Sequence, residues 1–212
     1  MEDVVLGPEE VVGDRPFTDI AHTRLEALVM GEMLVEERAR VAEWSRQSSD
    51  EQGVVLRERN EVGRRCLLVV PDVDALTRAP DLTAVGFFGA AREDVDHTIL
   101  FSLEDELVED MATSSAEGLM SYFDLELDER GRYGNLVLFA TPESAAEWAG
   151  NPIHRHAVEI SPLHYTTVRL HKGFVPGGLL GPGELKVSRT RYLDFTGGAR
   201  WRGLRHFPEP VG

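Results

Sequence analysis

The chain has 212 residues, of which 42% are hydrophobic, and a formal net charge of −15. This length and apolar content suffice for a core of its own, whereas the excess of Asp and Glu disfavours nucleic acid and anionic membrane surfaces as partners. No apolar run reaches the length of a membrane span, and the acidic start of the chain has no signal-peptide core, so we expect a soluble cytoplasmic protein.

The first part of the chain, residues 1–60, is predicted to be a helical extension of the main domain. Glycine and proline make residues 1–16 irregular. A helix is expected from about Thr18 to about Trp44, because apolar residues recur there at helical spacing with charged residues between them. The residues of this stripe are Leu25, Leu28, Val29, Met33 and Val41.

Residues 61–200 alternate strand and helix patterns, which predicts one α+β domain, and residues 201–212 are predicted to be an irregular tail. Strands are expected at 65–70, 82–91, 119–128, 133–140, 164–174 and 184–195, and helices at 73–79, 102–111, 141–150 and 153–160. From residue 82 the order is strand, helix, strand, strand, helix, strand. This order is typical of the ferredoxin-like split β-α-β plan, an antiparallel sheet with helices on one face.

Four of the seven histidines lie between residues 133 and 173: His154, His156, His164 and His171. The spacing of His154 and His156 is a poor metal pincer in a helix, since residues two apart point to nearly opposite sides. Zinc motifs such as HExxH and CxxC are absent from the sequence. Haem needs only one axial histidine, and His154 is our candidate. The alternative is a capping or surface role for both histidines.

The predicted strand at 164–174 has one polar face. Alternation places Tyr165, Thr167, Arg169 and His171 on that face, which is too polar for a core. Such a row can bind an anion or a polar aromatic ligand, and with His154 and His156 it would form two walls of one pocket. A solvated or dimer-packed face is the open alternative.

Two further residues could contribute to a pocket. Asn135 interrupts an apolar strand and needs partners, so it either stabilises the fold or faces a ligand. Trp148 lies on an alanine-rich helix, where packing against the sheet is the simpler interpretation.

The run from Phe139 to Ala157, a strand followed by PESAAEW and NPIHRHA, resembles the dimeric α/β-barrel superfamily and its antibiotic-biosynthesis monooxygenase-like members. The resemblance implies a homodimer in which two ferredoxin-like sheets pair, with the ligand between sheet and helices. Activities of the superfamily include cofactor-free oxygenation of aromatic polyketides, haem degradation and haem-dependent chemistry. Its haem-degrading members use an Asn, a Trp and a His, the residue types of Asn135, Trp148 and His154 or His156.

The predicted function is therefore that of an oxidoreductase or monooxygenase-like enzyme that binds haem or an aromatic small molecule. The catalytic candidates are His154, His156 and Asn135, with His154 as the axial ligand if haem is the cofactor. The substrate-binding candidates are Tyr165, Arg169, His171 and Trp148. Two alternatives stay open: a non-catalytic small-molecule-binding or haem-binding protein, and a cofactor-free isomerase or cyclase of the same fold.

Overall fold

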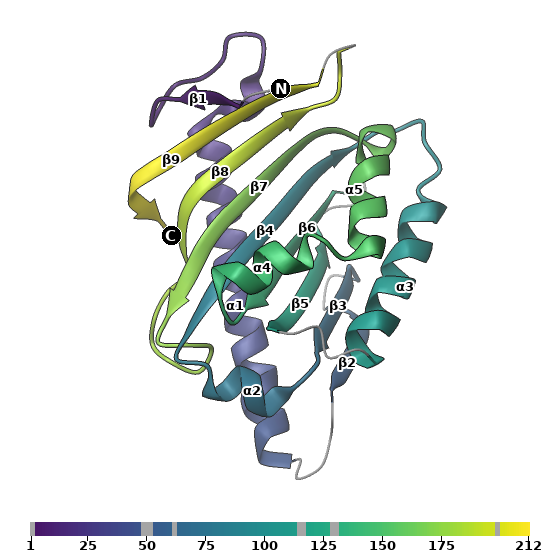
Figure 1. Cartoon of the computed structure of the whole chain (residues 1–212), viewed down its shortest axis with the longest axis vertical. Coiled ribbons are helices and arrows are strands. Elements are labelled where there is room, and N and C mark those ends of the chain that lie inside the picture. The colour runs from purple at the N-terminus through teal and green to yellow at the C-terminus, as the bar shows by residue number, and fades with distance from the viewer. Residues whose placement is uncertain (1–2, 48–52, 61–62, 114–117, 128–131, 198–199) are drawn as a thin grey trace.

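The computed structural model describes residues 3–47, 53–60, 63–113, 118–127, 132–197 and 200–212. Within these residues, nine strands form one mixed sheet and five α-helices pack against it, which makes an α+β structure (Figure 1). The strands are β1 (Val4–Leu6), β2 (Val54–Arg59), β3 (Arg65–Val70), β4 (Asp81–Ala91), β5 (Leu119–Glu126), β6 (Tyr133–Phe139), β7 (Tyr165–Pro176), β8 (Lys186–Asp194) and β9 (Trp201–Val211). The helices are α1 (Ile20–Gln47), α2 (Val73–Arg78), α3 (Thr98–Thr113), α4 (Pro142–Trp148) and α5 (Pro152–His164), with a 3-10 turn at Pro16–Thr18.

The strand order is β1-β9-β8-β7-β4-β6-β5-β3-β2, and β1 with β9 is the parallel pair. The four central strands β7-β4-β6-β5 are antiparallel and are connected through α3, a hairpin, and α4 with α5. This is the order that the split β-α-β plan predicts. The sheet is larger than that plan, however, because β8, β9 and β1 extend it on one side and β3 and β2 on the other.

The sheet includes strands from all three segments that the sequence predicted, which are residues 1–60, 61–200 and 201–212. The predicted irregular tail is a strand, β9, which pairs along β8. Its two prolines, Pro208 and Pro210, weakened the strand pattern in the sequence, but β9 lies next to the sheet edge, where missing N–H donors are tolerated. Within the predicted helical extension, β1 pairs with β9 and β2 pairs with β3.

Two helix ends differ from the prediction by four residues. Helix α3 begins at Thr98 instead of Ser102, because the Asp96 carboxylate accepts hydrogen bonds from the Thr98 backbone N–H and hydroxyl. Helix α5 continues through Pro162 to His164. No helix in the described ranges has both the length and the apolar character needed to cross a membrane.

Helices cover both faces of the sheet, whereas the sequence predicted helices on one face. Helix α1 crosses one face, and α3, α4 and α5 lie on the other (Figure 1). The core residues of α1 are Ala27, Met30, Met33, Leu34 and Val41, which pack in one cluster with Phe88, Phe123 and Leu136 of the sheet. Residues before position 60 therefore supply much of the main core.

Charged side chains are buried between α1 and the sheet. The Glu26 carboxylate accepts hydrogen bonds from Arg169 Nε at 2.8 and 2.9 Å and lies 2.8 Å from His171 Nε2. Thr190 Oγ1 lies 2.8 Å from His171 Nδ1. Burial raises the pKa of Glu26, but hydrogen bonds from His171 and Arg169 outweigh it and hold the pKa below its usual 4.5. Glu26 therefore stays ionised and neutralises the buried cation.

We expect Glu26→Gln to lower the free energy of unfolding at pH 7 by about 3–5 kcal/mol, because it leaves the Arg169 guanidinium buried without a counter-charge. Urea unfolding followed by circular dichroism measures this loss. Glu32→Gln, at an exposed position of the same helix, is the control and should change stability by less than about 0.5 kcal/mol. Equal effects of the two substitutions would contradict the role of Glu26.

Glu37 is a second buried carboxylate, and it should make the free energy of unfolding depend on pH. It lies on α1 and is fully buried, and burial raises its pKa from 4.5 to about 7, with the Ser121 hydroxyl as its polar neighbour. Since the folded state binds the proton more tightly, wild-type stability should fall as pH rises from 4.5 to 7. Relative to wild type, Glu37→Gln should gain about 3 kcal/mol over that interval. Urea unfolding of both proteins at pH 4.5 and pH 8 tests this, and a pH-independent difference would refute it.

Candidate functional site

The strand register lines up side chains in rows across the face that carries α3, α4 and α5. The first row is Asp124, Asn135, Phe87, Leu170, Arg191 and Leu204. The second row is Tyr122, Val137, Val85, Lys172, Arg189 and His206, and the third is Glu126, Tyr133, Gly89, Val168, Leu193 and Arg202. The helices cover the β5–β6 end of these rows and leave β8, β9 and the adjoining part of β7 uncovered (Figure 1).

The uncovered part of these rows carries a group of basic residues, which we call the basic sheet face: Lys172, Arg189, Arg191, Arg202 and His206. Arg191 and Arg202 are ion-paired with Asp3 at 3.1 and 3.4 Å. Lys172 and Arg189 have no ion pair within the described parts of the chain, although they are directly opposite each other on neighbouring strands. Like charges in that position repel, so this face favours an added anion.

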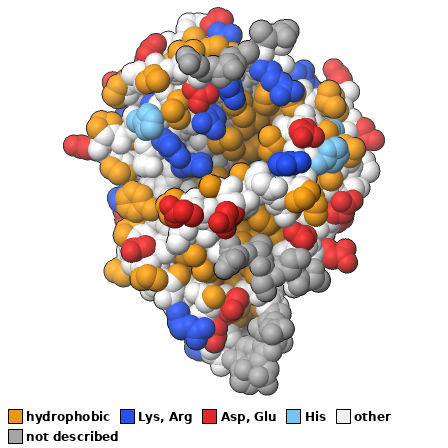
Figure 2. Space-filling view, in the orientation of Figure 1, with side chains coloured by type: hydrophobic (Ala, Val, Ile, Leu, Met, Phe, Trp, Pro, Cys, Tyr) orange, Lys and Arg blue, Asp and Glu red, His pale blue; other side chains and the backbone are white. Residues whose placement is uncertain are grey.

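Apolar residues separate the basic ones. Figure 2 shows a hollow on this side of the molecule, lined by hydrophobic side chains over the middle of the sheet, with Lys and Arg side chains along its border. In the first row, Phe87 of β4 and Leu170 of β7 are opposite each other on this side of the sheet, and both are half-buried. The Tyr165 ring packs edge-on against Phe87, with 5.3 Å between centroids. An apolar floor with a basic border is suited to a ligand with an apolar body and an acidic group.

The pKa of Lys172 is lowered by its position between the apolar surface and two arginines. Partial burial lowers the pKa of its ammonium group, and the positive charges of Arg189 and Arg191 lower it further. A bound anion would oppose the combined effect, since its attraction favours the charged form of the lysine.

Arg169 and His171 lie on the opposite face from this surface. Both are held under α1 by Glu26, as described above. Tyr165 does not share their face, because a bulge in β7 shifts the register: Ala90 is opposite Thr167, but Ala91 is opposite Tyr165. The extra residue turns Tyr165 onto the helix-bearing side.

The other predicted site residues are all on the helix-bearing side. Trp148 and His154 are neighbours, with ring centroids 6.2 Å apart, while His156 is exposed on α5. Burial lowers the pKa of His154, and its Nδ1 is buried without a hydrogen-bond partner among the described residues. Asn135 is half-buried on the sheet, where its side chain hydrogen-bonds to that of Tyr122. The sheet thus separates His154 and Trp148 from Arg169 and His171, and the expected pocket with both groups as walls does not form.

The basic sheet face escaped the sequence analysis although a signal for it was present. Arg189 and Arg191 alternate with buried Thr190 and Tyr192 along one strand. The predicted pocket includes the side of β7 that carries Arg169, whereas Lys172 lies on the other side. The strand pairing joins that lysine to arginines of β8 and β9, and no single segment of sequence contains all of them.

One group of possible metal ligands lies on the α1 side. Glu36, Glu58 and Cys66 bring their ligand atoms within 4.8 Å of one another. Arg40 donates hydrogen bonds to both carboxylates, at 2.7 Å to Glu36. Burial and the Glu36 charge raise the pKa of the Cys66 thiol to about 11, so it remains protonated. This group is therefore explained as an ion-pair network.

No protein-family model matches this chain, and no curated protein matches its sequence. Among solved structures, a heme-degrading enzyme from Listeria monocytogenes is similar over 57% of this chain and 81% of that one, with 11% identity and a TM-score of 0.32. At that score and identity, the likeness carries no argument about function.

We expect the low pKa of Lys172 to depend on Arg189. The sequence has two lysines, Lys172 and Lys186, so proton NMR of ¹³C-dimethylated protein gives two lysine side-chain signals, and Lys186→Arg assigns them. Arg189→Gln removes a neighbouring cation and should raise the pH at which the Lys172 signal titrates. Arg78→Gln, which changes an exposed side chain of α2, should leave it unchanged. An unchanged midpoint in Arg189→Gln would show that the two groups do not interact.

Proposed function

We propose that this protein binds a small acidic molecule with an apolar or aromatic body in the hollow beside the basic sheet face, and that the ligand is haem or an aromatic compound. The observation that supports this most is the position of Lys172 and Arg189. They lie side by side without an ion pair in the described structure, next to an apolar surface, in a chain of net charge −15.

The chemistry of such binding follows from the residue types. A carboxylate between Lys172 and Arg189 would replace their repulsion with two charge-assisted hydrogen bonds. Phe87 and Leu170 would contact the apolar body and exclude water from it, which strengthens the ionic contacts. Charge and shape would thus select the same class of ligand.

Haem fits the basic sheet face through its two propionate groups. Two histidines could serve as axial ligand: His206, which lies on this face opposite Arg189, and His154 on α5. A bound haem would supply iron for oxygen chemistry, as in the superfamily that the sequence resembles. The residues of this chain would hold the propionates, position the ring on the apolar floor and keep water away. An oxidoreductase of the monooxygenase type is the activity we propose for the protein.

Pairing with a second copy is another role for the same surface, and four half-buried apolar groups support it: Phe87, Leu170, Leu193 and Leu204. A two-fold interface brings the same patch of each copy together. The basic sheet face would then meet a second basic sheet face, and this repulsion favours an acidic ligand over an unliganded homodimer.

Haemin titration tests the proposal. Wild-type protein should give a Soret band that saturates at one haemin per chain, and Arg189→Glu should weaken binding at least about tenfold, because charge reversal repels a propionate. The matched control is Arg78→Glu, whose exposed side chain lies on α2. His206→Ala and His154→Ala then distinguish the two axial candidates by loss of the ligated spectrum.

Equal haemin affinity of Arg189→Glu and Arg78→Glu would contradict a site at the basic sheet face. If haemin does not bind, the same two variants are compared with 1-anthroate, an aromatic acid whose fluorescence reports on binding. Failure of both ligands to bind wild-type protein would overturn the proposed function.

A further inference from the structure

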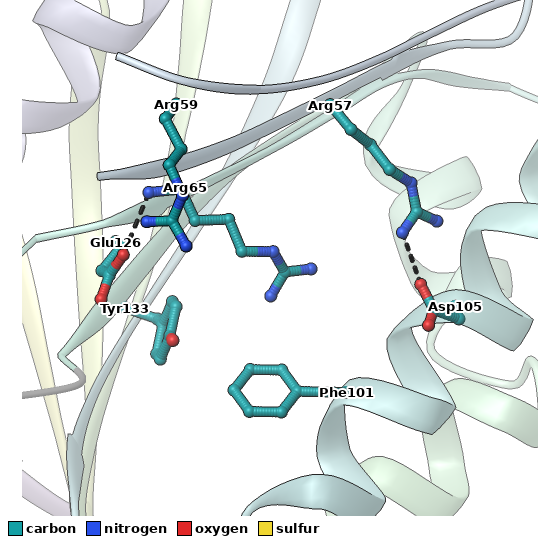
Figure 3. A pocket seen from close by; sticks show the side chains of 7 residues that line it. All are labelled: Arg57, Arg59, Arg65, Phe101, Asp105, Glu126 and Tyr133. Carbon is teal, nitrogen blue, oxygen red and sulfur yellow. Dashed lines mark hydrogen bonds and ion pairs between the residues drawn. The ribbon is translucent and has the colours of Figure 1, made fainter. Parts of the chain in front are cut away.

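A second pocket lies at the other end of the sheet, away from the basic sheet face, and has a volume of about 420 Å³. Strands β2, β3, β5 and β6 and helix α3 provide its walls (Figure 3). Its lining residues are Arg57, Arg59, Arg65, Phe101, Asp105, Glu126 and Tyr133. Three arginines and two aromatic rings thus surround one space.

The aromatic wall is partly open to solvent. Phe101 is 40% exposed and packs edge-on against Tyr133, with 6.1 Å between ring centroids. The Arg65 guanidinium lies 5.4 Å from the centre of the Phe101 ring. In Figure 3 the Phe101 ring and the Arg65 guanidinium both point into the space in front of Tyr133. A planar ring placed there could stack on either group.

The positive charges of the pocket are unevenly compensated. Arg57 is ion-paired with Asp105 at 2.6 Å, and Arg65 with Glu104. Glu126 accepts a hydrogen bond from the Arg65 backbone N–H at 3.0 Å. Arg59 donates to the Gly63 carbonyl oxygen at 2.7 Å, and it has no carboxylate partner within the described residues.

The register makes this uncompensated charge unfavourable. Arg59 and Arg65 are directly opposite each other on β2 and β3. Cross-strand pairs of like charge are destabilising, and an anion that contacts both guanidinium groups would reverse the sign of that interaction. The planar donors of arginine suit the two oxygens of a carboxylate or a phosphate.

We propose that this pocket binds a small aromatic anion, with its acidic group at Arg59 and Arg65 and its ring against Phe101 and Tyr133. Carboxylates and phosphate monoesters share this chemistry. The site shares no lining residue with the basic sheet face and does not depend on the function proposed for that face.

Isothermal titration calorimetry with 2-naphthoate and with 1-naphthyl phosphate tests the proposal and shows which acidic group is preferred. Both Arg59→Ala and Phe101→Ala should weaken binding of the preferred probe at least about tenfold, since each removes one half of the recognition. The control is Arg78→Ala, whose exposed side chain lies on α2 and which should bind as wild type does. Arg189→Glu is measured in parallel, because it shows whether any of the acid binds at the basic sheet face. The neutral analogue 2-naphthamide should bind at least about tenfold more weakly than 2-naphthoate.

Several outcomes would overturn this pocket as the site: no binding of either acid to wild-type protein, equal binding of 2-naphthamide, or loss in Arg189→Glu with full binding in Arg59→Ala. The last result would assign the acid to the basic sheet face. Nuclear Overhauser effects from naphthoate protons to Phe101 and Tyr133 in wild-type protein are a readout that does not depend on how the variants fold, and their absence under saturating ligand would also refute the proposal.

Discussion

Glu26 connects α1 to β7 by accepting hydrogen bonds from Arg169 while it contacts His171, and the arrangement of the sheet depends on this contact. Without a carboxylate at this point, the Arg169 side of β7 could not be buried, because an unpaired guanidinium is costly in a core. With it, a polar strand face becomes the inner surface beneath a long helix. Arg205 of β9 makes a similar contribution by donating to the Thr18 carbonyl and the Tyr192 hydroxyl.

The burial of this face determines what the other face displays. Strand alternation turns Lys172, Arg189 and Arg191 to the side opposite Arg169, and helices α3 to α5 do not extend over β8 and β9. The basic residues under α1 have acceptors provided by the protein, whereas Lys172 and Arg189 have no ion pair within the described residues. Two surfaces with similar composition thus have different roles: one stabilises the fold, and the other is available to a ligand.

Two differences between the predicted and the observed arrangement have identifiable physical causes. The stripe predicted for the first helix includes Leu25 and Leu28, which are about 60% exposed, while Glu26 and Glu37 are buried. A helix that buries carboxylates does not show the ordinary amphipathic period. The apolar stripe therefore predicted the helix correctly but not which face of it packs against the sheet. Likewise, alternation alone placed Tyr165 beside Arg169, because a bulge depends on the partner strand and leaves no mark in a period-two pattern.

By itself, the sequence determined the local elements: the long helix before residue 47, the capped start of α4 at Thr141, and the alternating strands from residue 65 to residue 194. Propensity, caps and side-chain periodicity are local properties, and they also account for the split β-α-β order of the four central strands. Only the tertiary structure decided which polar residues are buried and which remain available. The neutralisation of Arg169 by Glu26, and the opposition of Lys172 with Arg189 and of Arg59 with Arg65, bring together residues from different elements. Their energies depend on distance and burial, which no single stretch of sequence encodes.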